Sequence, residues 1–211
     1  MKRIYKNIHL PLFLLALLGV QFAHAQASLD VHMGVSGASD KSNGLAIDTF
    51  GDGTLYNTPS LNGVFLNFGA GAMLTSRFGF GGEFSLKPGK SDYAGLQYRP
   101  IFYDFNAIVH PLTSSKRIVP EVQAGLGGMN MKFYYNQQNC NAFAGCSSSS
   151  TFVQSANHFQ LHTGVGVSFF LTSKIYVRPQ FDLHWVNNFS QFNSNFVPQY
   201  GVSVGYRFGD N

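Results

Sequence analysis

The stretch that decides the fold is the run Gln199-Tyr200-Gly201-Val202-Ser203-Val204-Gly205-Tyr206-Arg207-Phe208 near the C-terminus. Its even-numbered residues are apolar or aromatic, and its odd-numbered residues are polar or glycine. Successive side chains of a β-strand point to opposite faces, so the run predicts a strand with one wholly apolar face. About ten such residues can cross a bilayer at a tilt. A half-buried strand of a soluble sandwich shows the same pattern. Whether the pattern recurs along the chain must therefore distinguish the two folds.

The same alternation recurs along the chain. The other expected strands are residues 29–36, 66–74, 78–87, 101–110, 121–127, 159–171 and 175–185. Together with 199–208 they predict an all-β fold of about eight strands, which is the smallest size of closed transmembrane barrel. We therefore expect a closed antiparallel up-and-down transmembrane β-barrel.

The connections between the expected strands alternate in length. The long polar segments are residues 37–60, 88–95, 135–157 and 187–197, and the short turns are 75–77, 113–117 and 172–174. Outer-membrane barrels have short periplasmic turns and long external loops. A soluble sandwich has no reason to keep this order, so the alternation favours the membrane barrel.

The polar face of the strands carries charged and titratable residues. They are Asp30, Glu83, Lys87, Asp104, Glu121, Arg178, Asp182, His184 and Arg207. A lysine or arginine that faces the middle of the hydrocarbon costs about 2–4 kcal/mol, so this face should line the lumen, where acids and bases can pair. A lumen of this width is filled by side chains. We expect the charge network to hold the barrel closed; the alternative is a gate whose ion pairs exchange partners.

The N-terminus reads as an export signal. Lys2, Arg3 and Lys6 precede the apolar run 10–20 and the small-x-small site at 23–25. This pattern predicts a signal peptide at 1–25 and a barrel domain at 26–211. Charged residues make up 11% of the chain, against roughly 25% in soluble domains. The expected mature chain contains no apolar run long enough for a transmembrane helix. It keeps eleven Lys and Arg against ten acids, which gives no argument for nucleic-acid binding.

With these features the chain resembles the small bacterial outer-membrane β-barrel proteins, in the form of a stand-alone outer membrane protein A-like barrel without a periplasmic domain. The family's C-terminal assembly signal, polar-x-Gly-x-x-apolar-x-aromatic, is matched by Gln199, Gly201, Val204 and Tyr206, with Phe208 after them. This sequence departs from the signal by continuing to Asn211. The resemblance implies the outer membrane of a Gram-negative bacterium, insertion by the barrel-assembly machinery, and contact with outer-membrane lipid and lipopolysaccharide.

Three smaller groups of residues have more than one interpretation. Cys140 and Cys146, in the third long segment, predict a disulfide in an exported protein; a metal site is the alternative. Asp48 and Asp52 favour a turn over a calcium site, because their spacing does not fit an EF-hand. Histidines 110, 162 and 184, with Asp182 nearby, favour a polar lumen network over the catalytic site of a lipid-modifying hydrolase.

These patterns favour a structural or surface-interaction role through four long external loops, which could bind a surface ligand. A narrow, porin-like gated channel for small solutes or ions is the alternative, and a lipid-modifying enzyme is the third possibility. We expect a monomer that is not an enzyme and uses no cofactor or metal. The aromatic residues expected in the girdles at the membrane interfaces are Tyr98, Tyr103, Phe169, Trp185 and Tyr206.

Overall fold

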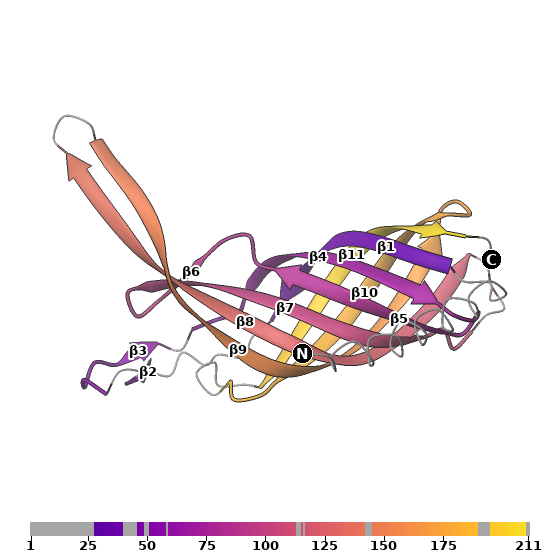
Figure 1. Ribbon diagram of the computed structural model, residues 1–211, viewed down its shortest axis with the longest axis horizontal. Coiled ribbons are helices and arrows are strands. Elements are labelled where there is room, and N and C mark those ends of the chain that lie inside the picture. The colour runs from indigo at the N-terminus through magenta and orange to yellow at the C-terminus, as the bar shows by residue number, and fades with distance from the viewer. Residues whose placement is uncertain are drawn as a thin grey trace, which may run out of the picture.

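The computed structural model describes residues 28–39, 46–48, 51–57, 59–112, 115, 117–141, 145–189 and 195–209. The signal peptide predicted at 1–25 lies outside these residues. Eight strands form the wall of a barrel, with one hairpin projecting far beyond it (Figure 1). The wall strands are β1 (Ser28–Ala38), β4 (Gly63–Met73), β5 (Phe78–Leu86), β7 (Leu96–Val109), β8 (Ile118–Asn141), β9 (Gly145–Phe170), β10 (Ile175–Val186) and β11 (Phe196–Phe208).

The wall strands follow one another as an antiparallel meander that closes on itself. The sheet order is β5-β4-β1-β11-β10-β9-β8-β7-β6, and an additional pairing of β5 with β7 completes the ring. The first and last strands pair from Leu29 opposite Phe208 to Ala38 opposite Gln199. Closure pairs the backbone groups that would otherwise face hydrocarbon at a sheet edge. The predicted closed up-and-down barrel is confirmed.

The external connections contain more strand than the sequence indicated. β2 (Ala46–Ile47) pairs with β3 (Tyr56–Asn57), and β6 (Ser91–Tyr93) pairs with the start of β7. The long polar segment at 135–157 is largely strand, because β8 and β9 continue as a paired ribbon to Asn141 opposite Gly145. This segment is rich in Ser, Asn and Gln and lacks the apolar alternation that marks the strands in the membrane.

The short turns share one local hydrogen bond, from a backbone N–H to a side-chain hydroxyl. The side-chain oxygens of Thr75, Ser115 and Thr172 each accept a hydrogen bond from the backbone N–H three residues later, at 3.0, 3.1 and 2.9 Å. A hydroxyl that satisfies its own turn lets the chain reverse within a few residues. The predicted turns at 75–77 and 172–174 are confirmed, and part of 113–117 lies outside the described residues.

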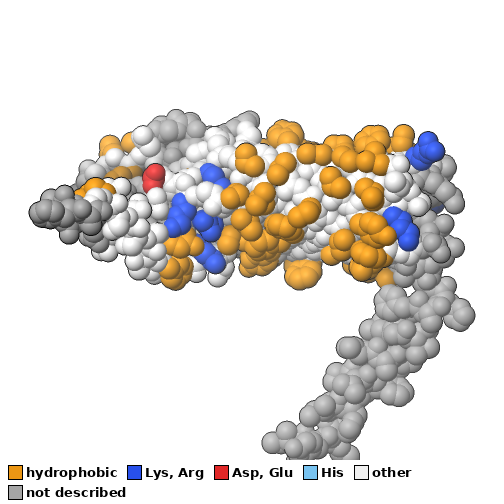
Figure 2. Space-filling model, turned by 90° about the horizontal axis from the view of Figure 1, so that it is seen from above, with side chains coloured by type: hydrophobic (Ala, Val, Ile, Leu, Met, Phe, Trp, Pro, Cys, Tyr) orange, Lys and Arg blue, Asp and Glu red, His pale blue; other side chains and the backbone are white. Residues whose placement is uncertain are grey.

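The barrel has an apolar outer surface. Large apolar side chains on the outer face of the strands are exposed, with Phe105 of β7 at 73%, whereas the residues that alternate with them along the membrane part of β7 are buried in the lumen. Figure 2 shows this apolar surface as a band along the barrel, with Lys and Arg side chains beyond both of its ends. The described part of the chain contains no helix that is long and apolar enough to cross a membrane.

Candidate functional site

The lumen is organised around Arg178. The alternation of β10 turns this side chain inward, where it is 4% exposed. The guanidinium donates to Oε1 of Glu121 at 2.7 Å and to Oε1 of Glu83 at 2.8 Å. It also donates to Oε1 of Gln180 at 3.1 Å and lies 2.7 Å from Nε2 of His32. Three other strands, β1, β5 and β8, supply side chains that reach Arg178, so the cluster ties together parts of the wall that are distant in sequence.

A second group of polar side chains is built around His162 of β9. Its Nε2 lies 3.2 Å from Oδ1 of Asp182, and its Nδ1 lies 2.9 Å from Oδ1 of Asn106 and 3.5 Å from Oδ1 of Asp104. Gln123 donates to Asp182 at 3.3 Å. Asp104 and Asp182 share the polar face with the arginines, but both carboxylates contact histidine instead. The reason is geometric, because Glu83 and Glu121 already occupy the guanidinium of Arg178.

Arg207 forms a separate pair close to the short-turn end of the barrel. It donates from Nε to Oδ1 of Asp30 at 2.8 Å and from Nη2 to Oδ2 at 3.0 Å. The two residues are direct cross-strand partners where β1 meets β11. The guanidinium also lies over the ring of Phe170, 4.5 Å from its centroid. This two-point contact spans the seam that closes the barrel.

Two residues assigned to the charge network lie in other surroundings. Lys87 donates to the backbone oxygen of Asn62 and to Oγ of Ser91, both at 2.7 Å, at the loop end of the barrel. His184 packs between two rings, with centroid distances of 4.8 Å to His162 and 4.8 Å to Phe102. Lys87 thus holds external connections together, and His184 makes ring contacts.

Some lumen residues were not singled out from the sequence. His32, Gln123 and Gln180 all contact the charged groups described above. Each occupies an inward position of its strand, so the same alternation could have identified them. Closer to the loops, Ser36 and Ser85 donate to Oδ1 of Asn67 at 3.2 and 2.8 Å, which adds an uncharged polar layer.

The loop end of the lumen is filled by apolar side chains. They form one buried cluster of Ala38, Leu61, Phe65, Tyr93, Tyr98, Phe102, Met129, Met131, Val186, Phe189 and Val197. Leu61 and Phe189 come from connections and fold over the mouth of the barrel. Beside Arg178 the lumen keeps a cavity of only about 10 Å³, which is the volume needed for about one water molecule. The lumen is therefore filled with side chains, as predicted, and an apolar plug lies above its polar part.

Glycines make room for the polar side chains. A Cβ atom at Gly164 would lie 2.4 Å from Oδ1 of Asp182, and one at Gly69 would lie 2.2 Å from Nε2 of His32. Both distances are far below van der Waals contact. A larger residue at either wall position would have to displace the end of the Asp182 or His32 side chain, which comes from a neighbouring strand.

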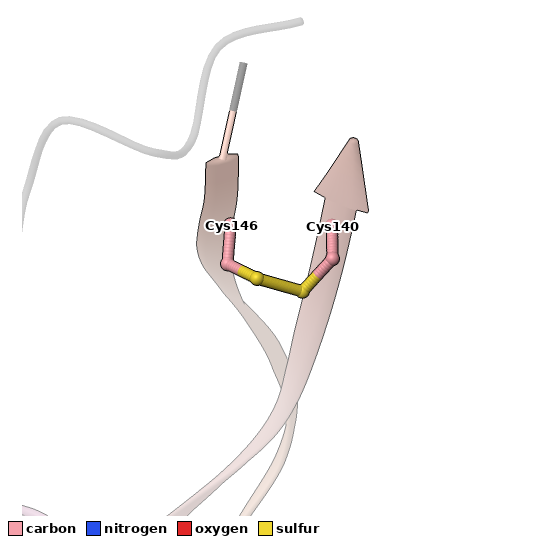
Figure 3. The surroundings of a disulfide bond; sticks show 2 residues. All are labelled: Cys140 and Cys146. Atoms are coloured by element: carbon pink, nitrogen blue, oxygen red, sulfur yellow. A yellow bond between two sulfur atoms is a disulfide. The ribbon is translucent and has the colours of Figure 1, made fainter. Parts of the chain in front are cut away.

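The projecting hairpin is closed by a disulfide. Cys140 and Cys146 are direct cross-strand partners near its tip, and their sulfur atoms are 2.06 Å apart (Figure 3). The predicted disulfide is confirmed. Because β7 stops pairing with β8 at Tyr134, residues 135–141 and 145–151 form a free two-stranded ribbon. At about 3.3 Å per residue it extends roughly 23 Å.

The first long connection forms a turn at the position where calcium was the alternative. Oδ1 of Asp48 accepts from the backbone N–H of Gly51 at 2.7 Å, and its Oδ2 accepts from Gly53 at 3.0 Å. Oδ1 of Asp52 accepts from the N–H of Thr54 at 2.8 Å. These carboxylates are already used by local backbone groups, which supports the turn.

The residues of the predicted assembly signal lie on β11. Val204, Tyr206 and Phe208 are exposed on its outer face, whereas Gln199 points into the lumen. Their recognition by the assembly machinery stays a prediction.

The prediction that Tyr98 belongs to an aromatic girdle is wrong, because its side chain is 2% exposed and belongs to the apolar plug.

A closed eight-stranded wall with an apolar exterior and a filled polar lumen defines an integral outer-membrane β-barrel protein. The chain belongs to the family of outer membrane protein beta-barrel domains, whose model matches residues 11–210. Its place is thus the outer membrane of a Gram-negative bacterium.

Solved structures of small outer-membrane barrels share the fold. OprG from Pseudomonas aeruginosa is 12% identical, with 88% of this chain and 98% of that chain covered and a TM-score of 0.53. Neisserial surface protein A is 15% identical, with 88% and 97% covered and a TM-score of 0.51. Ail, the attachment invasion locus protein of Yersinia pestis, solved with the heparin analogue sucrose octasulfate, is 14% identical, with 86% and 99% covered and a TM-score of 0.51. Among curated proteins, none matches this chain.

Proposed function

We propose that this protein is a closed, non-enzymatic outer-membrane barrel that binds a ligand at the cell surface through its external connections. The observation that carries the proposal is the free ribbon 135–141/145–151, which extends beyond the barrel and is closed by a disulfide. A covalent link at the tip reduces the number of conformations the ribbon can adopt, and a preorganised surface loses less entropy when it binds.

The chemistry of the ribbon indicates the kind of ligand. Residues 133–157 contain no Asp, Glu, Lys, Arg or His and are rich in Ser, Asn and Gln. Tyr135 is exposed at its base, and Phe152 and Val153 are exposed directly below it. Hydroxyl and amide groups beside aromatic rings suit a neutral hydrogen-bonding partner, such as a glycan or a polar protein surface. The charged group that contacts the base of the ribbon is Lys90, which donates to Oγ of Ser150 and lies over the ring of Tyr134.

A pore is the less favoured function because of the lumen contents. Arg178 and its carboxylates fill the polar part, and the apolar cluster covers the loop end. A lipid-modifying enzyme is also less favoured. Among the described residues, the rings of His32, His110 and His162 contact carboxylate, amide and guanidinium groups, not a serine hydroxyl that could act as the nucleophile.

Anionic outer-membrane lipid, including lipopolysaccharide, is the partner we propose for the outer wall just below the hairpin. Arg99 and Lys132 are direct cross-strand partners, and alternation with the buried Tyr98 and Met131 places them on the outer face. Figure 2 shows Lys and Arg side chains gathered next to the apolar band. Like charges opposite each other are unfavourable on a sheet, and a lipid phosphate between them would offset the repulsion.

Shortening the hairpin tests the surface role. Residues Tyr135 and Thr151 are cross-strand partners, so replacing 136–150 by Asn-Gly creates a two-residue turn in the correct register. The full chain and the shortened chain, each folded in lipid vesicles, are compared for binding to glycan arrays and to immobilised extracellular proteins. We expect binding by the full chain and its loss in the shortened chain. Equal binding by both, or by neither, would contradict the proposal.

A further inference from the structure

The middle of the lumen contains more carboxylates than permanent positive charges. Arg178 compensates Glu83 and Glu121. Within the described part of the chain, Asp104 and Asp182 form no ion pair with lysine or arginine, and the group facing both is the imidazole of His162. Buried carboxylates need a compensating charge, so a cation bound near Asp104 would balance this part of the lumen.

Three side chains from separate strands converge at that place. Asp104 of β7, His162 of β9 and His184 of β10 are buried, with exposures of 4%, 3% and 4%. Each offers one ligand atom, and these atoms lie within 4.8 Å of one another. Oδ1 of Asp104 is 3.5 Å from Nδ1 of His162. Two ligands on one tetrahedral zinc ion, at bond lengths of about 2.0–2.2 Å, are separated by about 3.3–3.5 Å.

The histidine environments provide a second, independent observation. Within the described residues, Nδ1 of His184 is buried without a hydrogen-bond partner, although buried ring nitrogens are normally paired. The ring stacks on that of His162 with an angle of 21° between their planes, so one of the two rings must turn before both can direct a nitrogen lone pair at the same ion. His162 in turn directs Nε2 to Oδ1 of Asp182 at 3.2 Å. A carboxylate that holds the far nitrogen of an imidazole is the usual support for a metal-binding histidine.

We propose that Asp104, His162 and His184 bind a divalent first-row transition metal, with zinc as the expected ion, inside the barrel. Two imidazole nitrogens and a carboxylate oxygen are the ligand set that zinc accepts. Oδ1 of Asn106, 2.9 Å from Nδ1 of His162, is placed to complete the coordination. The neighbouring group of Glu83, His162 and Asp182 is less suitable, because Glu83 is already bound by Arg178. The ion would cross-link β7, β9 and β10 from within.

The test measures metal retained by the folded full-length chain. The protein is refolded in lipid vesicles with zinc chloride, separated from free metal, and analysed for zinc by mass spectrometry. A parallel sample with Co²⁺ is examined for the visible absorption of a tetrahedral site. We expect one zinc ion per chain and a higher thermal midpoint than for the zinc-free protein, with no such increase when Mg²⁺ is added.

Variants then locate the ion. Asp104→Asn and His184→Phe should lose the zinc, and the phenylalanine keeps the ring stack, so folding can be checked by the heat-dependent gel mobility of the barrel. His158→Asn is the matched control, since His158 is half-buried on the external part of β9, where its Nδ1 lies 3.2 Å from the backbone oxygen of Asn187, and it should retain the zinc. Wild-type protein that holds no zinc, or variants that hold as much as wild type, would overturn the proposal.

Discussion

Replacing Arg178 by alanine tests the electrostatic account of the lumen. The guanidinium is 4% exposed and lies 2.7 Å from Glu121 and 2.8 Å from Glu83. Its loss leaves two buried carboxylates without their cation. Removing one partner of a buried ion pair costs about 3–5 kcal/mol, and we expect the upper part of that range because two acids lose their partner. The free energy of unfolding should fall by that amount.

The measurement is a urea titration of the protein folded in lipid vesicles. Trp185 is the single tryptophan of the chain and sits on β10, so its fluorescence reports unfolding of the barrel wall. A second variant combines Arg178→Met with Glu83→Gln and Glu121→Gln. It carries no unpaired charge at this place and should recover most of the lost stability.

Three results would refute this reasoning. Unchanged stability of Arg178→Ala would show that the ion pairs do not stabilise the barrel. A triple variant as unstable as the single one would show that the effect is not electrostatic. In planar bilayers we expect wild type and Arg178→Ala to be silent, because the apolar cluster at the loop end remains in place. Reproducible conductance steps that grow in the variant would instead indicate a gated pore.

Further predictions concern the outer surface, the glycines and the hairpin. Phe105→Arg puts a charge on a lipid-facing side chain that is 73% exposed, and near the bilayer midplane it should lower the unfolding free energy by about 2–4 kcal/mol; urea unfolding in vesicles with no change would contradict the apolar band. Gly164→Ala places Cβ 2.4 Å from Asp182 and should cost about 1–3 kcal/mol in the same assay, whereas an equally stable variant would show that the lumen can repack. Replacing Cys140 and Cys146 by serine should leave barrel unfolding unchanged and speed proteolysis of the ribbon, and equal proteolysis rates would contradict a stiffening role.

The strands of the barrel wall could be predicted from the local alternation of apolar and polar residues in the sequence. Alternation along a strand depends only on the period of two residues, so the apolar face at Tyr200, Val202 and Val204 and the inward position of Arg178 could be read directly. The eight strands, their short turns and the side facing lipid followed from this rule. The disulfide followed from two cysteines close together in an exported chain.

The choice of partners inside the lumen was decided by the tertiary structure. Arg178 meets His32 across 146 positions of sequence, and which acid it reaches depends on the registers accumulated around the ring. For the same reason Asp104 and Asp182 face His162, and Lys87 is retained at the loop end. Leu61 and Phe189 fold over the mouth from connections without any periodicity. Strand periodicity is a local property, whereas contacts across a closed barrel exist only after all its strands have paired.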